Sequence, residues 1–323
     1  MAKELFFEDV EMGDPLPSLA FQFDPASIRA LVDVWWPERG ATRFDSEAEA
    51  HRDGFPRPIV PSHLSIGYLG NVVLAWAGNV RLAKLDSICR QVLFNNDHVT
   101  CQGFVVDKAL QDGLPLVHAD LYMESEQGER PLTSSALILV PTREGPSAHT
   151  LPGLPPPVAG AATSVGLSSV DAQGLKVDFD RSVIGVEQDL GAVTITEERI
   201  VAYARAVGAS DPIYWDRRAA QHGPYGGLVA LPTFCSILST RSRGGIGPDV
   251  KLKFGTTGQE ATLAVENYRL IRPGDVLRIL AKVKDVYAKT GRSGTMVFTV
   301  YQDTFLDPQG TPVAAVTRSS VNF

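Results

Sequence analysis

The fold is decided by residues 203–234, which read YARAVGASDPIYWDRRAAQHGPYGGLVALPTF. A helical stretch ends near Gly208, and a polar turn follows at Asp211-Pro212. Asp216 then opens a stretch rich in alanine, and a short apolar run leads to Pro232. The same succession recurs in the first half of the chain, so the sequence indicates two copies of one structural unit.

The copies match from their first elements onward. In the first half, an alternating strand at residues 19–23 runs into Asp24, a typical helix N-cap, with Pro25 at the first helical position. In the second half, a strand at residues 193–195 runs into Thr196, and glutamates follow in the first helical turn. Later landmarks pair as Asp45 with Asp216, Phe55 with Tyr225, and Asp107 with Asp285, on which long strands are expected to close.

A linker separates the two copies. Residues 144–174 are rich in Pro, Gly, Ala and Ser and nearly uncharged, which predicts a flexible segment, stiffer at Leu154-Pro-Pro-Pro157. The expected domains are therefore residues 1–143 and 175–323. Each copy is predicted as strand, helix, loop, buried central helix (Leu64 to Ala77 in the first) and then several antiparallel strands. That order indicates an α+β fold with a sheet wrapped around a helix.

The composition excludes several classes of protein. The 323 residues carry a net charge of −7, so nucleic acid is an unexpected partner. The acidic start does not resemble a signal peptide, and the longest apolar stretch is too short to span a bilayer, so we expect a cytoplasmic location. The three cysteines and the scattered histidines match no disulfide framework or metal motif, and no glycine-rich nucleotide motif occurs. We therefore expect no metal and no cofactor.

The paired landmarks resemble the double hot-dog form of the MaoC-like hydratase/dehydratase family. The second half, through residues 203–216 and 223–234, is similar to the non-catalytic subunit of mycobacterial-type hydroxyacyl dehydratases. The first half, through residues 10–17 and 54–60, is more similar to the catalytic partner. The resemblance implies two domains that join their sheets around two central helices. It also implies at most one working pocket, lined by the first half and roofed by the second.

The family's catalytic signature is Asp-x-Asn-Pro-x-His-x-Asp, followed by a helix start whose backbone N–H stabilises the thioester oxyanion. Laid on the second half, this pattern puts Ala209 at the Asp position, Asp211 at the Asn position and Tyr214 at the His position. Ala209 offers no acid or base, and a tyrosine with a pKa near 10 is a poor base at neutral pH. Asp211 and Tyr214 are therefore expected to bind substrate. The alternative is that Asp211 forms a turn and that the Tyr214 ring fills the space a histidine would occupy.

In the first half, Glu38 stands at the Asp position and Arg43 at the His position. Glutamate is a suitable acid/base, whereas a guanidinium stays protonated and can only anchor an anionic or carbonyl group. Glu38 and Arg43 are thus predicted catalytic residues, with a surface salt bridge between them as the alternative. Trp36, just upstream, is predicted to wall the pocket, although core packing would explain it equally well.

Ser62 and His63 stand at the expected start of the central helix, where free N–H groups and the positive end of the helix dipole suit an oxyanion. A neutral His63 there would replace the missing base, with Ser62 beside the substrate. The alternative makes Ser62 an N-cap and His63 a solvent-facing residue.

Three hypotheses about function follow from the incomplete dyad. The first is a hydratase or dehydratase (a hydro-lyase) acting on an acyl thioester or polyketide-type intermediate, linked to coenzyme A or to a carrier protein. The second is a repurposed enzyme of secondary metabolism, such as a cyclase, an isomerase or an oxa-Michael lyase. The third is a non-catalytic acyl-binding scaffold. In each case the expected partner is a small-molecule acyl substrate, and the family's fold suggests a homodimer.

Overall fold

The computed structural model describes residues 4–156, 177–238, 247–255, 258–291 and 294–323. Within these ranges the helices are α1 (Pro25–Trp35), α2 (Glu47–Arg52), α3 (Ser62–Trp76), α5 (Glu197–Ala206) and α6 (Arg217–His222). Four short 3-10 helices accompany them: η1 (Phe7–Asp9), η2 (Arg181–Val183), η3 (Pro212–Tyr214) and η4 (Phe234–Leu238). No helix in these ranges is long and apolar enough to cross a bilayer.

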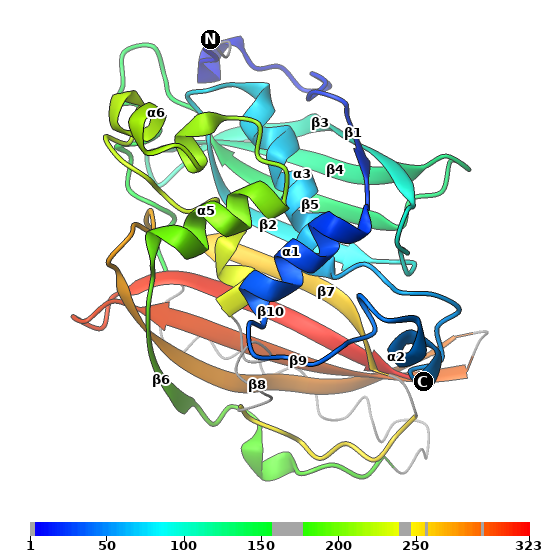
Figure 1. The fold of residues 1–323 in the computed structure, drawn as a ribbon. Coiled ribbons are helices and arrows are strands. Elements are labelled where there is room, and N and C mark those ends of the chain that lie inside the picture. The colour runs from blue at the N-terminus through cyan, green and yellow to red at the C-terminus, as the bar shows by residue number, and fades with distance from the viewer. Residues whose placement is uncertain (1–3, 157–176, 239–246, 256–257, 292–293) are drawn as a thin grey trace.

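The strands form a single ten-stranded sheet (Figure 1). The first half contributes β1 (Leu19–Gln22), β2 (Arg81–Cys89), β3 (His98–Gln111), β4 (Leu114–Ser125) and β5 (Leu132–Leu139). The second half contributes β6 (Gln188–Thr194), β7 (Gly258–Asn267), β8 (Val276–Gly291), β9 (Gly294–Leu306) and β10 (Pro312–Asn322). The order is β1-β3-β4-β5-β2-β7-β10-β9-β8-β6, so the two halves meet where β2 pairs with β7. This arrangement confirms the α+β class and the two joined sheets.

Helix starts follow the predicted capping chemistry. The Asp24 side chain accepts hydrogen bonds from the amides of Ala26 and Ser27, and Thr196 accepts one from the amide of Arg199. Both contacts satisfy amides that a helix start leaves without an intrahelical partner. The predicted N-caps of the first α-helix in each half are therefore confirmed.

The expectation that strands close on Asp107 and Asp285 is wrong. Strands β3 and β8 continue through these positions, and in each the pairing register shifts just before the aspartate. In each case the aspartate side chain accepts the amide of the next residue, at 2.8 Å. The aspartates thus mark the same β-bulge in both halves, a local irregularity that strand patterning in the sequence does not reveal.

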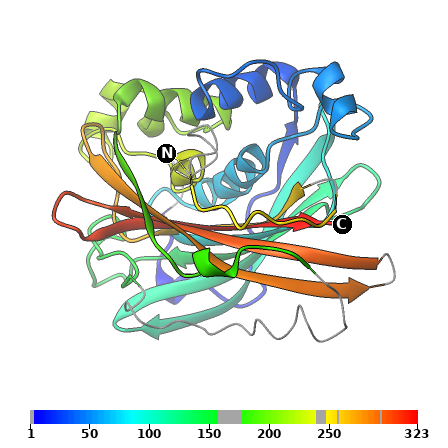
Figure 2. The same ribbon diagram turned by 90° about the horizontal axis from the view of Figure 1, so that it is seen from below.

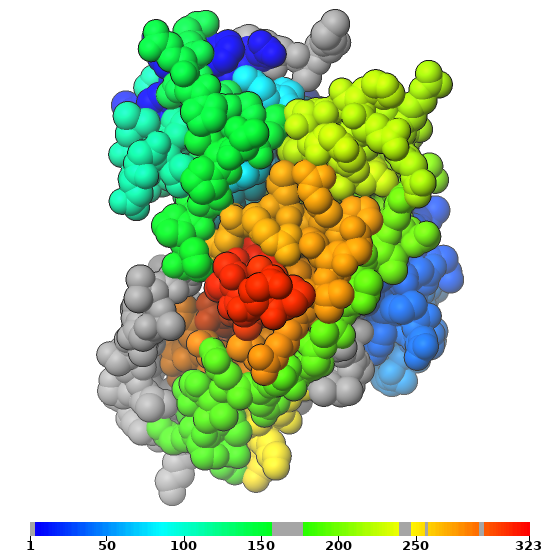
Figure 3. All heavy atoms as spheres, turned by 90° about the vertical axis from the view of Figure 1, so that its left-hand side faces the viewer, coloured from blue at the N-terminus to red at the C-terminus, as the bar shows by residue number. Residues whose placement is uncertain are grey.

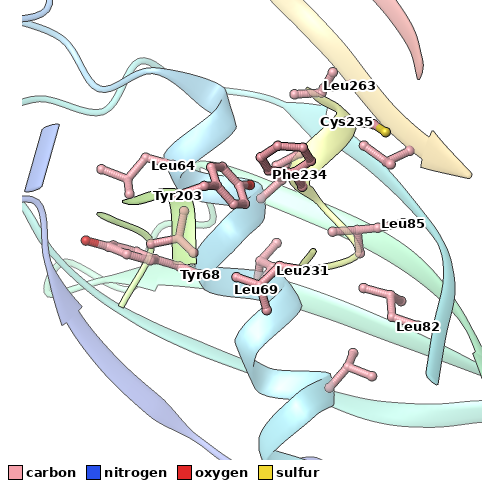
Figure 4. Close-up of a cluster of buried hydrophobic side chains, with 14 of the residues drawn as sticks. Leu64, Tyr68, Leu69, Leu82, Leu85, Tyr203, Leu231, Phe234, Cys235 and Leu263 are labelled. Carbon is pink, nitrogen blue, oxygen red and sulfur yellow. The ribbon is translucent and has the colours of Figure 1, made fainter. Parts of the chain in front are cut away.

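The α-helices of the described residues lie on one face of the sheet (Figure 2). Helix α3 and η4 rest against the sheet, while α1 and α5 pack on each other above them. Figure 4 shows that the core between these layers is shared, because Leu64 and Leu69 of α3 meet Tyr203, Phe234 and Leu263 of the second half. The two halves therefore share one large core, and each also contains a smaller apolar cluster of its own.

The described part of the linker packs against the protein. Arg81, at the start of β2, donates hydrogen bonds to the carbonyls of Leu151 (3.0 Å) and Pro152 (2.8 Å). In Figure 3 the green spheres around residue 150 lie against the first half and beside the orange second half. The predicted flexibility of this segment thus does not apply to residues 147–154, and linker residues 157–174 lie outside the described residues.

Candidate functional site

A cavity of about 320 Å³ opens where the two halves meet, at the N-terminus of α3. Its walls come from the loops on either side of α2, the start of α3, the end of β2, the start of β5, and strands β7, β9 and β10. The volume is in the range of small-molecule sites, which are mostly apolar with a few convergent polar groups. Its apolar lining residues include Phe44, Phe55, Ile59, Leu93, Met296 and Phe298.

The floor of the cavity is the open N-terminus of α3. Pro61 is the N-cap residue, and no side chain caps this end of the helix. The interpretation of Ser62 as an N-cap is therefore not met, because its hydroxyl instead donates a hydrogen bond to the Glu260 carboxylate. An uncapped helix start leaves amide donors and the positive end of the dipole directed into the cavity, where they favour negative charge.

His63 follows Ser62 and also lines the cavity. It is only 3 % exposed, and its ring lies edge-on to Trp35 with the ring centroids 4.4 Å apart. The solvent-facing alternative for His63 is therefore not met.

Arg43 reaches the cavity from a short loop held in place by Asp45. Asp45 accepts hydrogen bonds from the amide and hydroxyl of Thr42 and pairs with Arg39 at 2.7 Å. The Arg43 guanidinium lies 3.7 Å from Asp53 and 3.5 Å from the carbonyl oxygen of Gly258 in β7. Burial lowers the pKa of Arg43, while the carboxylates of Asp53 and Glu260 oppose that shift, so the side chain stays a cation in the cavity wall.

Glu260 is the functional candidate that sequence reasoning missed. It lies in β7 of the second half and is the sole acidic side chain among the lining residues that the structure describes. Its partner Ser62 lies in the first half, so the contact joins residues far apart in the sequence. No motif marks Glu260, because it resembles any other polar residue near a strand end.

Cys89 also lines the cavity, at the end of β2. Burial raises the pKa of its thiol to about 12, and the nearby Glu260 carboxylate adds to the rise. A thiol with that pKa is protonated at neutral pH and is a poor nucleophile. Besides this thiol, the polar side chains that line the cavity are one carboxylate, one imidazole, three guanidiniums, two hydroxyls and two amides: Glu260, His63, Arg43, Arg90, Arg318, Ser62, Ser65, Gln91 and Gln259.

The other predicted site residues lie elsewhere. Glu38 is exposed in the turn after α1, and neither Glu38 nor Trp36 lines the cavity, whereas Trp35 does. Asp211 accepts the amide of Ile213 at the start of η3. Tyr214 is 4 % exposed, and its hydroxyl lies 3.5 Å from that of Tyr225. The structure thus brings Arg43, Ser62 and His63 together and leaves Glu38, Trp36, Asp211 and Tyr214 outside.

Comparisons with known proteins agree with this architecture. A model of the FAS1-like dehydratase domain region matches residues 182–316. A UPF0336 protein of Saccharopolyspora erythraea is 30% identical over 118 residues, which cover 35% of this chain and 74% of the relative.

Solved structures show the same fold at low identity. A MaoC domain protein from Chloroflexus aurantiacus is 13% identical, with a TM-score of 0.71 over 100% of this chain and 98% of the other. A Mycobacterium tuberculosis protein with a double hot-dog fold is 14% identical, with a TM-score of 0.63 over 99% of both chains. A MaoC-like dehydratase from Phytophthora capsici is 8% identical, with a TM-score of 0.57 over 97% of both. Because this chain is 30% identical to the Saccharopolyspora relative and covers 74% of it, the chain belongs to the same family as that UPF0336 protein, and the solved structures show that its fold is the double hot-dog fold.

Proposed function

We propose that the protein is a hydro-lyase that adds water to, or removes it from, the carbon–carbon bond next to an acyl thioester. The observation that carries the proposal is the cavity between the halves, whose apolar walls end at the uncapped start of α3 beside Arg43. A hydro-lyase needs that combination, because an apolar chain and a carbonyl that gains negative charge must be held in one place.

Each part of the cavity has a task in this reaction. Aromatic and aliphatic walls, such as Phe55 and Leu93, accommodate the acyl chain. The first amides of α3 and the Arg43 guanidinium offset the charge that develops on the thioester oxygen. A proton must also leave or reach the α-carbon, which requires a positioned acid/base within hydrogen-bond reach. His63 lies at the helix start to hold the hydroxyl group that leaves or attacks.

The experiment is mass spectrometry of the purified protein with enoyl and 3-hydroxyacyl thioesters of varied chain length, carried on coenzyme A or on a carrier protein. Gain or loss of one water is the expected result. Two matched variants locate the reaction. Val321→Trp fills the β10 wall of the cavity and should abolish turnover, whereas Val276→Trp, at an exposed position of β8, should retain it.

Other outcomes would replace the proposal. Tight binding of the acyl chain without any conversion would favour a non-catalytic acyl-binding scaffold. Conversion without a change in mass would favour an isomerase or a cyclase that uses the same cavity. Turnover that survives in Val321→Trp would place the chemistry outside this cavity.

A further inference from the structure

We infer that Glu260, supplied by the second half, is the group that moves the proton in the cavity of the first half. The inference rests on the proposed hydro-lyase function and names its acid/base. It assigns this role to a strand residue of the domain whose own signature positions carry Ala209 and Tyr214.

The contacts of Glu260 are those of a held and accessible carboxylate. The Ser62 hydroxyl donates to one carboxylate oxygen, Oε2. Arg43 lies 3.5 Å from the carbonyl oxygen of Gly258, two residues before Glu260, and the Glu260 charge raises the pKa of Arg43. Glu260 is only partly buried and lines the cavity directly. A carboxylate oriented by a hydroxyl, beside a cation and facing a substrate cavity, has the surroundings of a general acid/base.

A β-bulge aims Glu260 at the cavity. In the pairing of β10 with β7, Ser319 lies opposite Thr262, but Ser320 lies opposite Glu260, so Ala261 is an extra residue in β7. Side chains alternate between the faces of a strand, and one extra residue moves all the preceding ones to the other face. Leu263 packs in the core on the helix side. Without the bulge, the Glu260 side chain would lie on the face of β7 opposite to Leu263. With the bulge, the side chains of Glu260 and Leu263 both point toward α3.

The other candidates for proton transfer are less suitable. Arg43 cannot release a proton near neutral pH, and the Cys89 thiol has its pKa raised by burial. Glu38 is exposed and does not line the cavity. His63 is the remaining titratable side chain at the floor, and the experiment tests it beside Glu260.

The reaction balances with one carboxylate. In the dehydration direction, Glu260 takes the proton from the α-carbon, and the electron pair of that C–H bond forms the double bond to the β-carbon. The bond between the β-carbon and its oxygen then breaks. The departing oxygen takes the proton from the Glu260 carboxylic acid, so that water leaves and the carboxylate is restored. Hydration is the same sequence in reverse.

The test compares Glu260→Gln with Glu266→Gln, a matched change in the same strand where Glu266 pairs with Lys84. Glu260→Gln should lower kcat by about 10²- to 10⁴-fold, the usual contribution of a general acid/base, with KM nearly unchanged. Glu266→Gln should keep kcat. Added formate or acetate should partly restore turnover in Glu260→Ala, which loss of structure alone would not allow. Ser62→Ala should lower kcat with KM nearly unchanged, because Ser62 only positions the carboxylate, and Ser62→Thr, which keeps a hydroxyl, should restore kcat.

Two results would overturn the assignment while leaving the hydro-lyase function intact. One is full turnover in Glu260→Gln. The other is a large loss in Glu38→Gln or His63→Ala together with a modest loss in Glu260→Gln. A wild-type protein that converts no thioester would remove both the function and the assignment of Glu260.

Discussion

The two halves of the molecule use the same positions in opposite ways. In the first half, the region before the central helix opens into a cavity with Arg43 and His63 in its walls. In the second half, Tyr214 is buried and packs against Tyr225, and the ring of His149 in the linker lies edge-on to Tyr225 with the ring centroids 4.6 Å apart. One copy of the fold therefore keeps space for a ligand, and the other uses side chains and the linker to fill that space.

The first residues of the two central strands show the same division. Strand β7 begins near Glu260, whose carboxylate faces the cavity, while β2 begins at Arg81, whose guanidinium binds the linker carbonyls. Glu260 of the second half thus faces the cavity of the first half, whereas Arg81 of the first half makes a structural contact on the filled side near Tyr225. The comparison teaches that duplication of a fold does not duplicate a site, because a site also needs unfilled volume.

The largest expected effect that sharpens this comparison is at Arg43. Arg43→Ala should lower kcat/KM by about 10²- to 10³-fold, the usual cost of losing one donor to a developing oxyanion. Arg43→Lys should recover part of the activity, because it restores the charge without the fixed fork geometry. Steady-state kinetics with an active thioester measure both. Arg130→Ala, which removes an exposed arginine paired with Glu124, is the control. Unchanged kinetics in Arg43→Ala would exclude Arg43 from the site.

A smaller effect, on stability rather than activity, is expected at Arg81. Arg81→Met keeps the length of the side chain but removes both hydrogen bonds to the linker, which should cost about 2–4 kcal/mol of unfolding free energy. Denaturant unfolding measures the loss, and proteolysis should begin to cut near residue 152. Turnover should persist, since Arg81 does not line the cavity. Loss of turnover in a folded Arg81→Met protein would show that the filled side of the molecule contributes to function.

The smallest expected effect concerns the loop that presents Arg43. Burial raises the pKa of Asp45. The hydrogen bonds from Thr42 and the ion pair with Arg39 together lower it by more, so the net pKa lies below its usual value. A depressed carboxyl pKa stabilises the folded state above the unfolded pKa, near 4, and that stability is lost as the pH falls through the folded pKa. Asp45→Asn should therefore cost about 1–2 kcal/mol at pH 7, from lost charged hydrogen bonds.

Denaturant unfolding of Asp45→Asn and the wild type at several pH values checks this prediction. The difference between the two proteins should shrink below about pH 4, where the wild-type carboxylate becomes protonated. A difference that stayed constant with pH would mean that the ionised form of Asp45 contributes nothing to the loop.

Much of the fold was predictable because its signals are local. Asp24 and Thr196 indicate helix starts through capping chemistry, and the structure confirms both caps. Part of the site was predictable for the same reason, since Ser62 and His63 lie at the start of an apolar helix. Glu38 shows where prediction from the sequence ends. The signature alignment predicts that it is catalytic, but it lies in a turn that faces solvent.

By itself, the sequence determined the α+β class, the duplication and the helix start at which the cavity ends, since each depends on contacts between residues close in the chain. Only the tertiary structure decided which carboxylate faces that helix start and which copy stays open. Glu260 reaches Ser62 because β2 pairs with β7 and because the extra residue Ala261 turns the strand. Strand pairing between distant segments and a one-residue bulge leave no periodic trace in the sequence, so the partner of a site residue appears only after the chain has folded.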